Sequence, residues 1–252
     1  MGGGTGRKGD VPTATDAANL SLKVAELTLA LDTKLSSLEF SLPESHVKFS
    51  IVRSDSFNNN SPNQLTLTLQ DTPLPRISHR GVALCRTLIW EMWQEEDGDY
   101  IFTTPRQLPL SLLRVAPDFR SGSLTVDSAS GARSVFYPLQ GIDNVLFINW
   151  LAMSGDISLH ASGMAVDGRG YIFIGPSKAG KSTLVRGIMN ADPSVTVLGE
   201  DQLFLRLVNG RFWVYGTPWH EDPLICSPLG VPLEKVFFLE RGPGRHLELC
   251  SP

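Results

Sequence analysis

The sequence predicts an α/β domain that follows a β-rich N-terminal region. Three observations lead to this fold class. Residues 20–138 contain short runs in which apolar and polar residues alternate, a pattern typical of half-buried strands. Residues 142–153 form an apolar run without strict alternation, which favours a helix. Beyond residue 157, strand-like apolar runs lie on both sides of one helix-like segment, as they do in α/β proteins.

These changes of pattern divide the chain into three parts. Residues 1–18 are glycine-rich and polar, and we expect a disordered tail. Residues 19–140 are expected to form a β-rich accessory region, and residues 141–252 a separate α/β domain. The last predicted strand ends close to Pro252. The domain is therefore expected to be short or incomplete at this end, because a parallel sheet needs cover on both faces.

The strands of the N-terminal region follow from alternation and from turn residues. Residues 20–31 alternate between apolar and polar at first, but the pattern becomes irregular further on. A strand is favoured, and an amphipathic helix is the alternative. A hairpin is predicted over residues 87–104, with Asp97-Gly98 as its turn signal. Single strands are predicted at residues 46–52, 65–69, 112–115, 124–126 and 134–137.

In the second half, capping and turn residues mark the elements. The helix over residues 142–153 has Asp143 as a candidate N-cap and Gly155 beyond its end. Asn209-Gly210 between two apolar runs predicts a hairpin over residues 203–215. Further strands are expected at residues 157–166, 171–174, 195–198 and 236–239.

A glycine-rich loop stands between the predicted strand 171–174 and a helix that is expected to be under way by Leu184. Its pattern is G-x-x-x-x-G-K-S, the signature of a phosphate-binding P-loop. Backbone N–H groups of such a loop surround an anion, and the helix adds the partial positive charge of its N-terminus. The loop consists of Gly175, Pro176, Ser177, Lys178, Ala179, Gly180, Lys181, Ser182 and Thr183.

The residue types of this loop predict binding of ATP with Mg²⁺. Lys181 can reach the β- and γ-phosphates, and the Ser182 hydroxyl can ligate the metal. Lys178 is either a solvated loop residue or an extra phosphate contact. Glu200-Asp201 follow the predicted strand 195–198. We expect Asp201 to be a Mg²⁺ ligand, because metal carboxylates lie at the carboxyl end of a strand beside the P-loop strand; a cap of a helix or turn is the alternative.

Composition narrows the classes of partner and the compartment. A net charge of −4 argues against general binding of nucleic acids. The three cysteines form no close pair, which favours reduced thiols. The longest apolar run, residues 145–153, is too short to cross a bilayer, and the N-terminus has no apolar signal segment. We therefore expect a cytoplasmic protein without a membrane partner.

Residues 142–240 resemble the HPr kinase/phosphorylase-like family, which is related to ATP-dependent phosphoenolpyruvate carboxykinase. The resemblance rests on the order of helix, His160, P-loop and acidic pair, and extends to Gly216-Thr217-Pro218-Trp219 and to residues 236–240. It is strongest with divergent members from peptide-modification gene cassettes. It implies that residues 141–252 form a P-loop nucleotide-binding core of the HPr kinase-like type. Family members are often oligomers, so a homo-oligomer is an expectation as well.

The resemblance also implies roles for single residues. His160 would lie near the phosphates, and Trp219 and His220 near the site. Of Glu200 and Asp201, one would hold Mg²⁺ and the other would act as base on the acceptor hydroxyl. Two positions differ from the family pattern: Lys178 stands where a glycine is usual, and Glu200 where an aspartate is usual. From the residues alone, His160 also fits a structural strand histidine, and His220 a solvated loop.

The functional prediction is a Mg²⁺-dependent kinase that uses ATP. His160, Lys181, Glu200 and Asp201 are its candidate catalytic residues, and Ser182 and Asp201 its metal ligands. The acceptor would be a hydroxyl of a peptide, a protein or a small molecule. A nucleotide-binding regulator or scaffold of a biosynthetic cassette, without catalytic transfer, is the alternative. A P-loop ATPase coupled to motion is a weaker one, because no arginine finger and no longer helical domain are recognisable.

Overall fold

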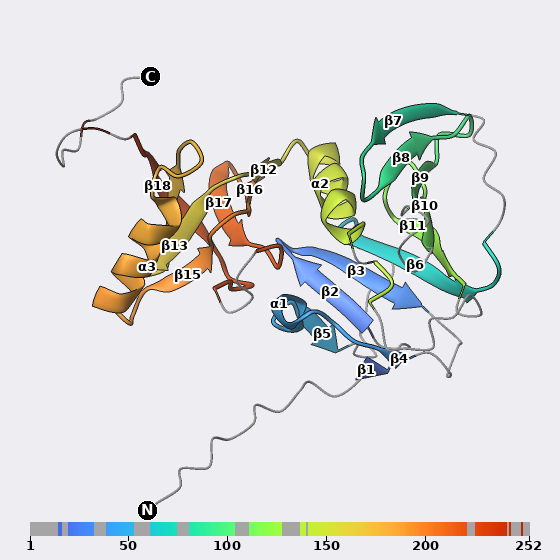
Figure 1. Ribbon diagram of the computed structural model, residues 1–252, viewed down its shortest axis with the longest axis horizontal. Helices are drawn as coiled ribbons and strands as arrows, with labels where there is room; N and C mark the ends of the chain where they lie inside the picture. The colour runs from blue at the N-terminus through green and yellow to red at the C-terminus, as the bar shows by residue number, and fades with distance from the viewer. Residues whose placement is uncertain are drawn as a thin grey trace, which may run out of the picture. The chain divides into compact units, whose positions relative to one another are not determined.

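The computed structural model describes residues 15–16, 20–32, 39–52, 61–74, 81–103, 111–127, 137–139, 141–220, 225–240, 242 and 248 (Figure 1). The chain divides into two compact units, residues 1–147 and 148–252. The division falls inside helix α2, Asp143–Met153. None of the described helices is long and apolar enough to cross a membrane.

The first unit is built on a nine-stranded sheet with the order β5-β2-β3-β6-β11-β10-β9-β8-β7. Strand β6 has parallel neighbours on both sides, and the other pairs are antiparallel. The strands are β2 (Leu20–Val24), β3 (Leu27–Asp32), β5 (Ser50–Val52), β6 (Gln64–Asp71), β7 (Val82–Arg86), β8 (Glu91–Gln94), β9 (Tyr100–Thr103), β10 (Ser111–Val115) and β11 (Ser121–Val126).

Alternation explains the core of this sheet. Leu65, Leu67 and Leu69 of β6 are buried, while Thr68 and Gln70 between and beyond them are exposed. Burial of such apolar side chains stabilises the sheet by roughly 1.5–3 kcal/mol for each fully buried leucine. The predictions of strands at residues 65–69, 112–115 and 124–126 and of the hairpin arms at 89–93 and 100–102 are confirmed, with shifts of a few residues at their ends.

Two sequence predictions in this unit need correction. Residues 20–31 form two strands, because Ala25 and Glu26 take positive φ angles of 51° and 64° and make a tight hairpin turn. Residues 46–52 are not one strand: α1 (Glu44–Val47) ends there, and only β5 is extended. Of the expected tail, Thr15–Asp16 form β1, which pairs with β4 (Glu39–Phe40), and the rest lies outside the described residues, as do residues 134–136.

A buried polar network explains why α1 forms where a strand was expected. Nε2 of His46 lies 2.7 Å from Oδ2 of Asp143, and Nδ1 lies 3.0 Å from the Ser45 hydroxyl. The Tyr137 hydroxyl donates to the same Asp143 oxygen at 3.1 Å. A buried carboxylate needs such partners, and this requirement outweighs the local alternation around His46.

The second unit is built on a seven-stranded sheet with the order β12-β16-β17-β18-β14-β13-β15. Only the β14–β18 pair is parallel among the described pairs of this sheet. Its helix, α3 (Lys181–Ala191), packs on β13 and β15 (Figure 1). The strands are β12 (Ile157–Leu159), β13 (Ser162–Val166), β14 (Arg169–Ile174), β15 (Thr196–Gly199), β16 (Leu203–Val208), β17 (Arg211–Gly216) and β18 (Gly230–Phe238).

The predicted α/β fold class, a P-loop core of the HPr kinase-like type, is therefore wrong. The chain is mostly β, with two large mixed sheets and, in the described residues, only α1, α2 and α3 as helices. The physical reason lies in the strand pairing. In an α/β fold the neighbouring strands of the sheet are mostly parallel, but β13 pairs antiparallel with both β14 and β15 and lies between them.

Most of the individual elements of this half agree with the sequence. The helix at residues 142–153 is confirmed, and so are the strands at 171–174, 195–198 and 236–239. The Asn209-Gly210 hairpin is confirmed, with φ angles of 51° and 76° at these two residues. Residues 157–166 are two strands rather than one, since His160 and Ala161 connect β12 to β13.

Each face of this sheet has its own apolar core. On one face, Val185 of α3 packs with Phe173, Met164, Val195 and Val197. On the other, Ile172, Val214 and Val231 pack together with buried residues of the neighbouring strands. Gly170 permits this second packing, because a Cβ there would collide with Cγ1 of Val214. The two cores fix the edge at which β14 and β15 both end.

Candidate functional site

The glycine-rich loop connects the end of β14 to the start of α3. Its conformation requires left-handed backbone at two places: φ is 64° at Lys178 and 97° at Gly180, the residue before the helix. Glycine adopts this region without cost, whereas lysine pays about 1–2 kcal/mol. The loop is closed by an Ala179 N–H to Pro176 carbonyl hydrogen bond of 3.1 Å. Strand, loop and helix thus follow one another as the P-loop motif predicts.

Lys181, the first residue of α3, is bound back onto the loop. Its Nζ donates to the Gly175 carbonyl at 2.8 Å and to the Pro176 carbonyl at 3.3 Å, and the residue is only 8% exposed. An ammonium group has three donors, so the third can serve an anion while the other two hold the chain in place. The lysine is therefore fixed where the loop curls.

Strand directions explain how Asp201 reaches this loop. β15 and β14 both pair antiparallel with β13, so they run in the same direction and end at the same edge of the sheet. Two hydrogen bonds connect the segment after β15 to the start of β13: Ala161 N–H donates to the Asp201 carbonyl at 3.2 Å, and Ser162 Oγ to the Glu200 carbonyl at 2.7 Å. They place His160 beside Asp201.

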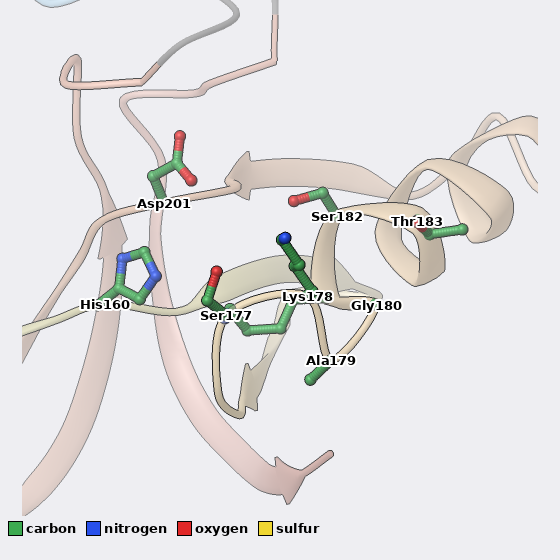
Figure 2. Close-up of a pocket in the computed structure, with 9 residues that line it drawn as sticks. His160, Ser177, Lys178, Ala179, Gly180, Ser182, Thr183 and Asp201 are labelled. Carbon is green, nitrogen blue, oxygen red and sulfur yellow. The ribbon is translucent and has the colours of Figure 1, made fainter. Parts of the chain in front are cut away.

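The loop, His160 and Asp201 surround one pocket of about 530 Å³. Figure 2 shows Ser182 at the start of α3, with His160 and Asp201 on the opposite side of the loop residues. Of the predicted site residues, the structure brings together those that line this pocket: His160, Ser177, Lys178, Ala179, Gly180, Lys181, Ser182, Thr183 and Asp201. Gly175 and Pro176 support it through their carbonyls, which accept from Lys181.

Glu200 is a predicted catalytic residue that does not line the pocket. Its carboxylate is buried and accepts two hydrogen bonds from Arg186 of α3, Nε to Oε1 at 2.8 Å and Nη2 to Oε2 at 2.9 Å. The two parallel bonds make a bidentate pair. The sequence did not indicate this partner, because Arg186 and Glu200 come together only through the packing of α3 on β15.

The side chain of His220 makes specific contacts near the pocket, which a residue in a solvated loop would not need. The Asp201 backbone N–H donates to His220 Nδ1 at 3.3 Å. Because the backbone nitrogen can only donate, Nδ1 accepts, and the neutral ring carries its proton on Nε2. The ring lies over Gly199, where a Cβ would be 2.6 Å from Nε2. Trp219, the other residue expected near the site, packs its ring on Phe204 with a centroid distance of 5.6 Å.

The residues of the pocket fit a phosphate chain with a magnesium ion. Mg²⁺ keeps several waters and is held by one or two side-chain oxygens together with substrate phosphates. The Ser182 hydroxyl and the Asp201 carboxylate line the same pocket as two lysines, so both kinds of ligand converge. In the described part of the chain, no three His, Cys, Asp or Glu side chains gather as a metal cluster. The donor set therefore suits a metal that arrives with phosphates.

Comparison with models of protein families and with curated proteins finds no match for this chain. The geometry of the pocket and the residue pattern of the loop are therefore the observations that bear on function.

Proposed function

We propose that the chain is a kinase that transfers the γ-phosphoryl group of ATP to a hydroxyl acceptor and requires Mg²⁺. One observation carries this proposal: Asp201, from the end of β15, lines the same pocket as the phosphate-loop residues Lys181 and Ser182. A cation, a hydroxyl and a carboxylate around one loop of this pattern are the parts that phosphoryl transfer needs.

In this proposal the protein acts mainly by positioning. Lys181 and the loop N–H groups bind the β- and γ-phosphates, and Ser182 and Asp201 hold Mg²⁺. The metal, when bound, supplies charge neutralisation on the phosphate oxygens. His160 is exposed at the rim of the pocket, where it faces an incoming acceptor. Most of the acceleration then comes from orientation and electrostatics rather than from proton transfer.

The hydroxyl acceptor is supported by the resemblance to the HPr kinase/phosphorylase-like family. That resemblance covers His160, the loop and Asp201, and it favours a peptide, a protein or a small molecule as acceptor. A cytoplasmic location belongs to the same proposal, since Cys85 and Cys226 are free thiols, as in a reducing compartment.

A nucleotide-binding protein without transfer is a second candidate function. The observation that favours it is the Arg186–Glu200 pair. Both carboxylate oxygens of Glu200, one of the two predicted acidic residues, accept hydrogen bonds from Arg186. Asp201 is then the carboxylate among the residues that line the pocket. A single carboxylate cannot hold the metal and act as the base at the same time.

The test is ATP binding and turnover by the purified chain, with and without Mg²⁺. Lys181→Ala removes the phosphate cation and is expected to abolish binding, whereas Lys235→Ala, on the exposed surface of β18, serves as the control. Mg²⁺-dependent loss of ATP that disappears in Lys181→Ala supports the kinase. Binding without turnover, in the presence of serine-containing peptides and small hydroxyl compounds, supports the second candidate. Equal binding by Lys181→Ala would refute both.

A further inference from the structure

The Arg186–Glu200 pair lies immediately beside the two residues proposed to hold Mg²⁺. Ser182 and Arg186 are four positions apart in α3, so they lie on the same face of the helix, one turn from each other. Glu200 directly precedes Asp201 in the chain. One bidentate pair thus connects the element that carries the hydroxyl ligand to the element that carries the carboxylate ligand.

The pair has the geometry of a fixed connection. The side chain of Glu200 is 7% exposed and that of Arg186 is 48% exposed, with both N–H···O distances below 3.0 Å. A planar guanidinium with two parallel bonds restrains direction as well as distance. The length of the side chain matters too. An aspartate at position 200 would be one methylene shorter and would draw its oxygens back from the guanidinium.

We infer that Arg186 and Glu200 are positioning residues that set the distance between Ser182 and Asp201 for Mg²⁺ binding, and that Glu200 is not the base. The inference rests on the proposed function, because it assigns the metal to Ser182 and Asp201. Groups that orient metal ligands from outside the coordination sphere commonly change metal affinity by about 10–100-fold when they are altered.

The experiment measures the Mg²⁺ concentration that gives half-maximal ATP binding, by calorimetry or with a fluorescent ATP analogue. The variants are Arg186→Lys, Glu200→Gln and Glu200→Asp, each checked for folding by thermal unfolding. Each is expected to need about tenfold more Mg²⁺ than the wild type. The double variant Arg186→Met/Glu200→Met, which leaves no buried charge unpaired, is expected to match the single variants rather than to add their effects.

Arg169→Met is the matched control. Arg169 pairs with Glu234 at 3.7 Å at the opposite end of β14, so this variant also breaks an ion pair of the same unit. It is expected to leave the Mg²⁺ dependence unchanged.

Two results would overturn the inference alone. One is a Mg²⁺ dependence equal to that of the wild type in all Arg186 and Glu200 variants. The other is loss of phosphoryl transfer at saturating Mg²⁺ in both Glu200→Gln and Glu200→Asp while Arg186→Lys transfers like the wild type, which would make Glu200 a catalytic residue. If the wild type itself shows no Mg²⁺-dependent ATP binding, the proposed function fails, and the inference fails with it.

Discussion

Nδ1 of His220 accepts a hydrogen bond from the backbone N–H of Asp201. On its other side, the Asp201 carbonyl accepts from the Ala161 N–H. The backbone of the proposed metal ligand is therefore held between a loop histidine and the segment that carries His160. A side chain can point reliably into a pocket only when its own backbone is restrained in this way.

We expect His220→Ala to weaken Mg²⁺-dependent ATP binding by about three- to tenfold, because a typical hydrogen bond contributes about 0.5–1.5 kcal/mol. His220→Asn places an oxygen acceptor near the position of Nδ1 and is expected to restore most of the affinity. Calorimetric titration with ATP and Mg²⁺ measures both. Gly199→Ala should have the same effect as His220→Ala, since its Cβ displaces the ring, and should have little further effect once His220 is already alanine.

Lys178→Gly is expected to change stability and affinity in opposite directions. Lysine holds a φ of 64° in the loop, and relief of this conformation should raise the free energy of unfolding by about 1 kcal/mol. Loss of its charge from the pocket should lower ATP affinity about tenfold if it contacts a phosphate. Lys178→Ala keeps a non-glycine residue at this left-handed position, so it removes the charge without relieving the backbone conformation. Higher stability with unchanged affinity would show that Lys178 is only a solvated loop residue.

Gly170→Ala tests the packing behind the site. Its Cβ would collide with Cγ1 of Val214 and lie 3.1 Å from Cγ2 of Val231. Overpacking of this kind costs about 1–3 kcal/mol, which chemical denaturation of the second unit would detect. Gly187→Ala, in α3 with nothing within 4 Å of the new Cβ, is the control. It should stabilise the helix by about 0.5–1 kcal/mol, so equal effects of the two changes would contradict the packing described for Gly170.

Because of Tyr137, we expect the stability of the first unit to depend on pH. Burial raises the pKa of its phenol well above the ordinary value of 10.0, and the nearby carboxylate of Asp143 raises it further. The unfolded chain therefore loses this proton at a lower pH than the folded one. The contribution of Tyr137 to the free energy of unfolding is complete below the pKa of the phenol in the unfolded chain. It is lost as the pH rises from there toward the pKa of the phenol in the folded chain.

Tyr137→Phe should remove this alkaline loss of stability, at a cost of about 1 kcal/mol at neutral pH for the missing hydrogen bond to Asp143. Denaturation curves between roughly pH 8 and 11, on either side of the ordinary phenol pKa, measure the slope. Tyr100→Phe, in the same unit, controls for removal of a tyrosine hydroxyl. An unchanged slope in Tyr137→Phe would rule out Tyr137 as its source.

Local signals predicted local structure well. Asn209-Gly210 identified its hairpin because the turn needs two positive φ angles. Ala25 and Glu26 make a similar turn without any such signal, since the packing of β2 and β3 imposes it. The glycine-rich loop predicted strand, loop and helix. Asp201 lines the pocket at this loop although β13 separates β15 from β14, and its role as a Mg²⁺ ligand stays a prediction.

What the sequence could not show were the long-range pairings. The partner of Glu200 is a residue of α3 that no spacing rule connects to it. The antiparallel pairing of β15 with β13, which overturns the α/β prediction, also depends on contacts between distant segments. The resemblance placed His220 near the site, but its hydrogen bond to the Asp201 backbone carried no signal, because a histidine in a polar loop looks the same with or without a backbone partner.

The position of β6 has a consequence for how the first unit folds during synthesis. Gln64 pairs with Thr28, which precedes it by several elements, and Thr66 pairs with Ser121, which leaves the ribosome much later. Parallel pairings between such distant segments cost loop-closure entropy before they return any contact energy. Strand β6 can therefore pair with β3 early, but its other side stays unpaired until β11 has been synthesised.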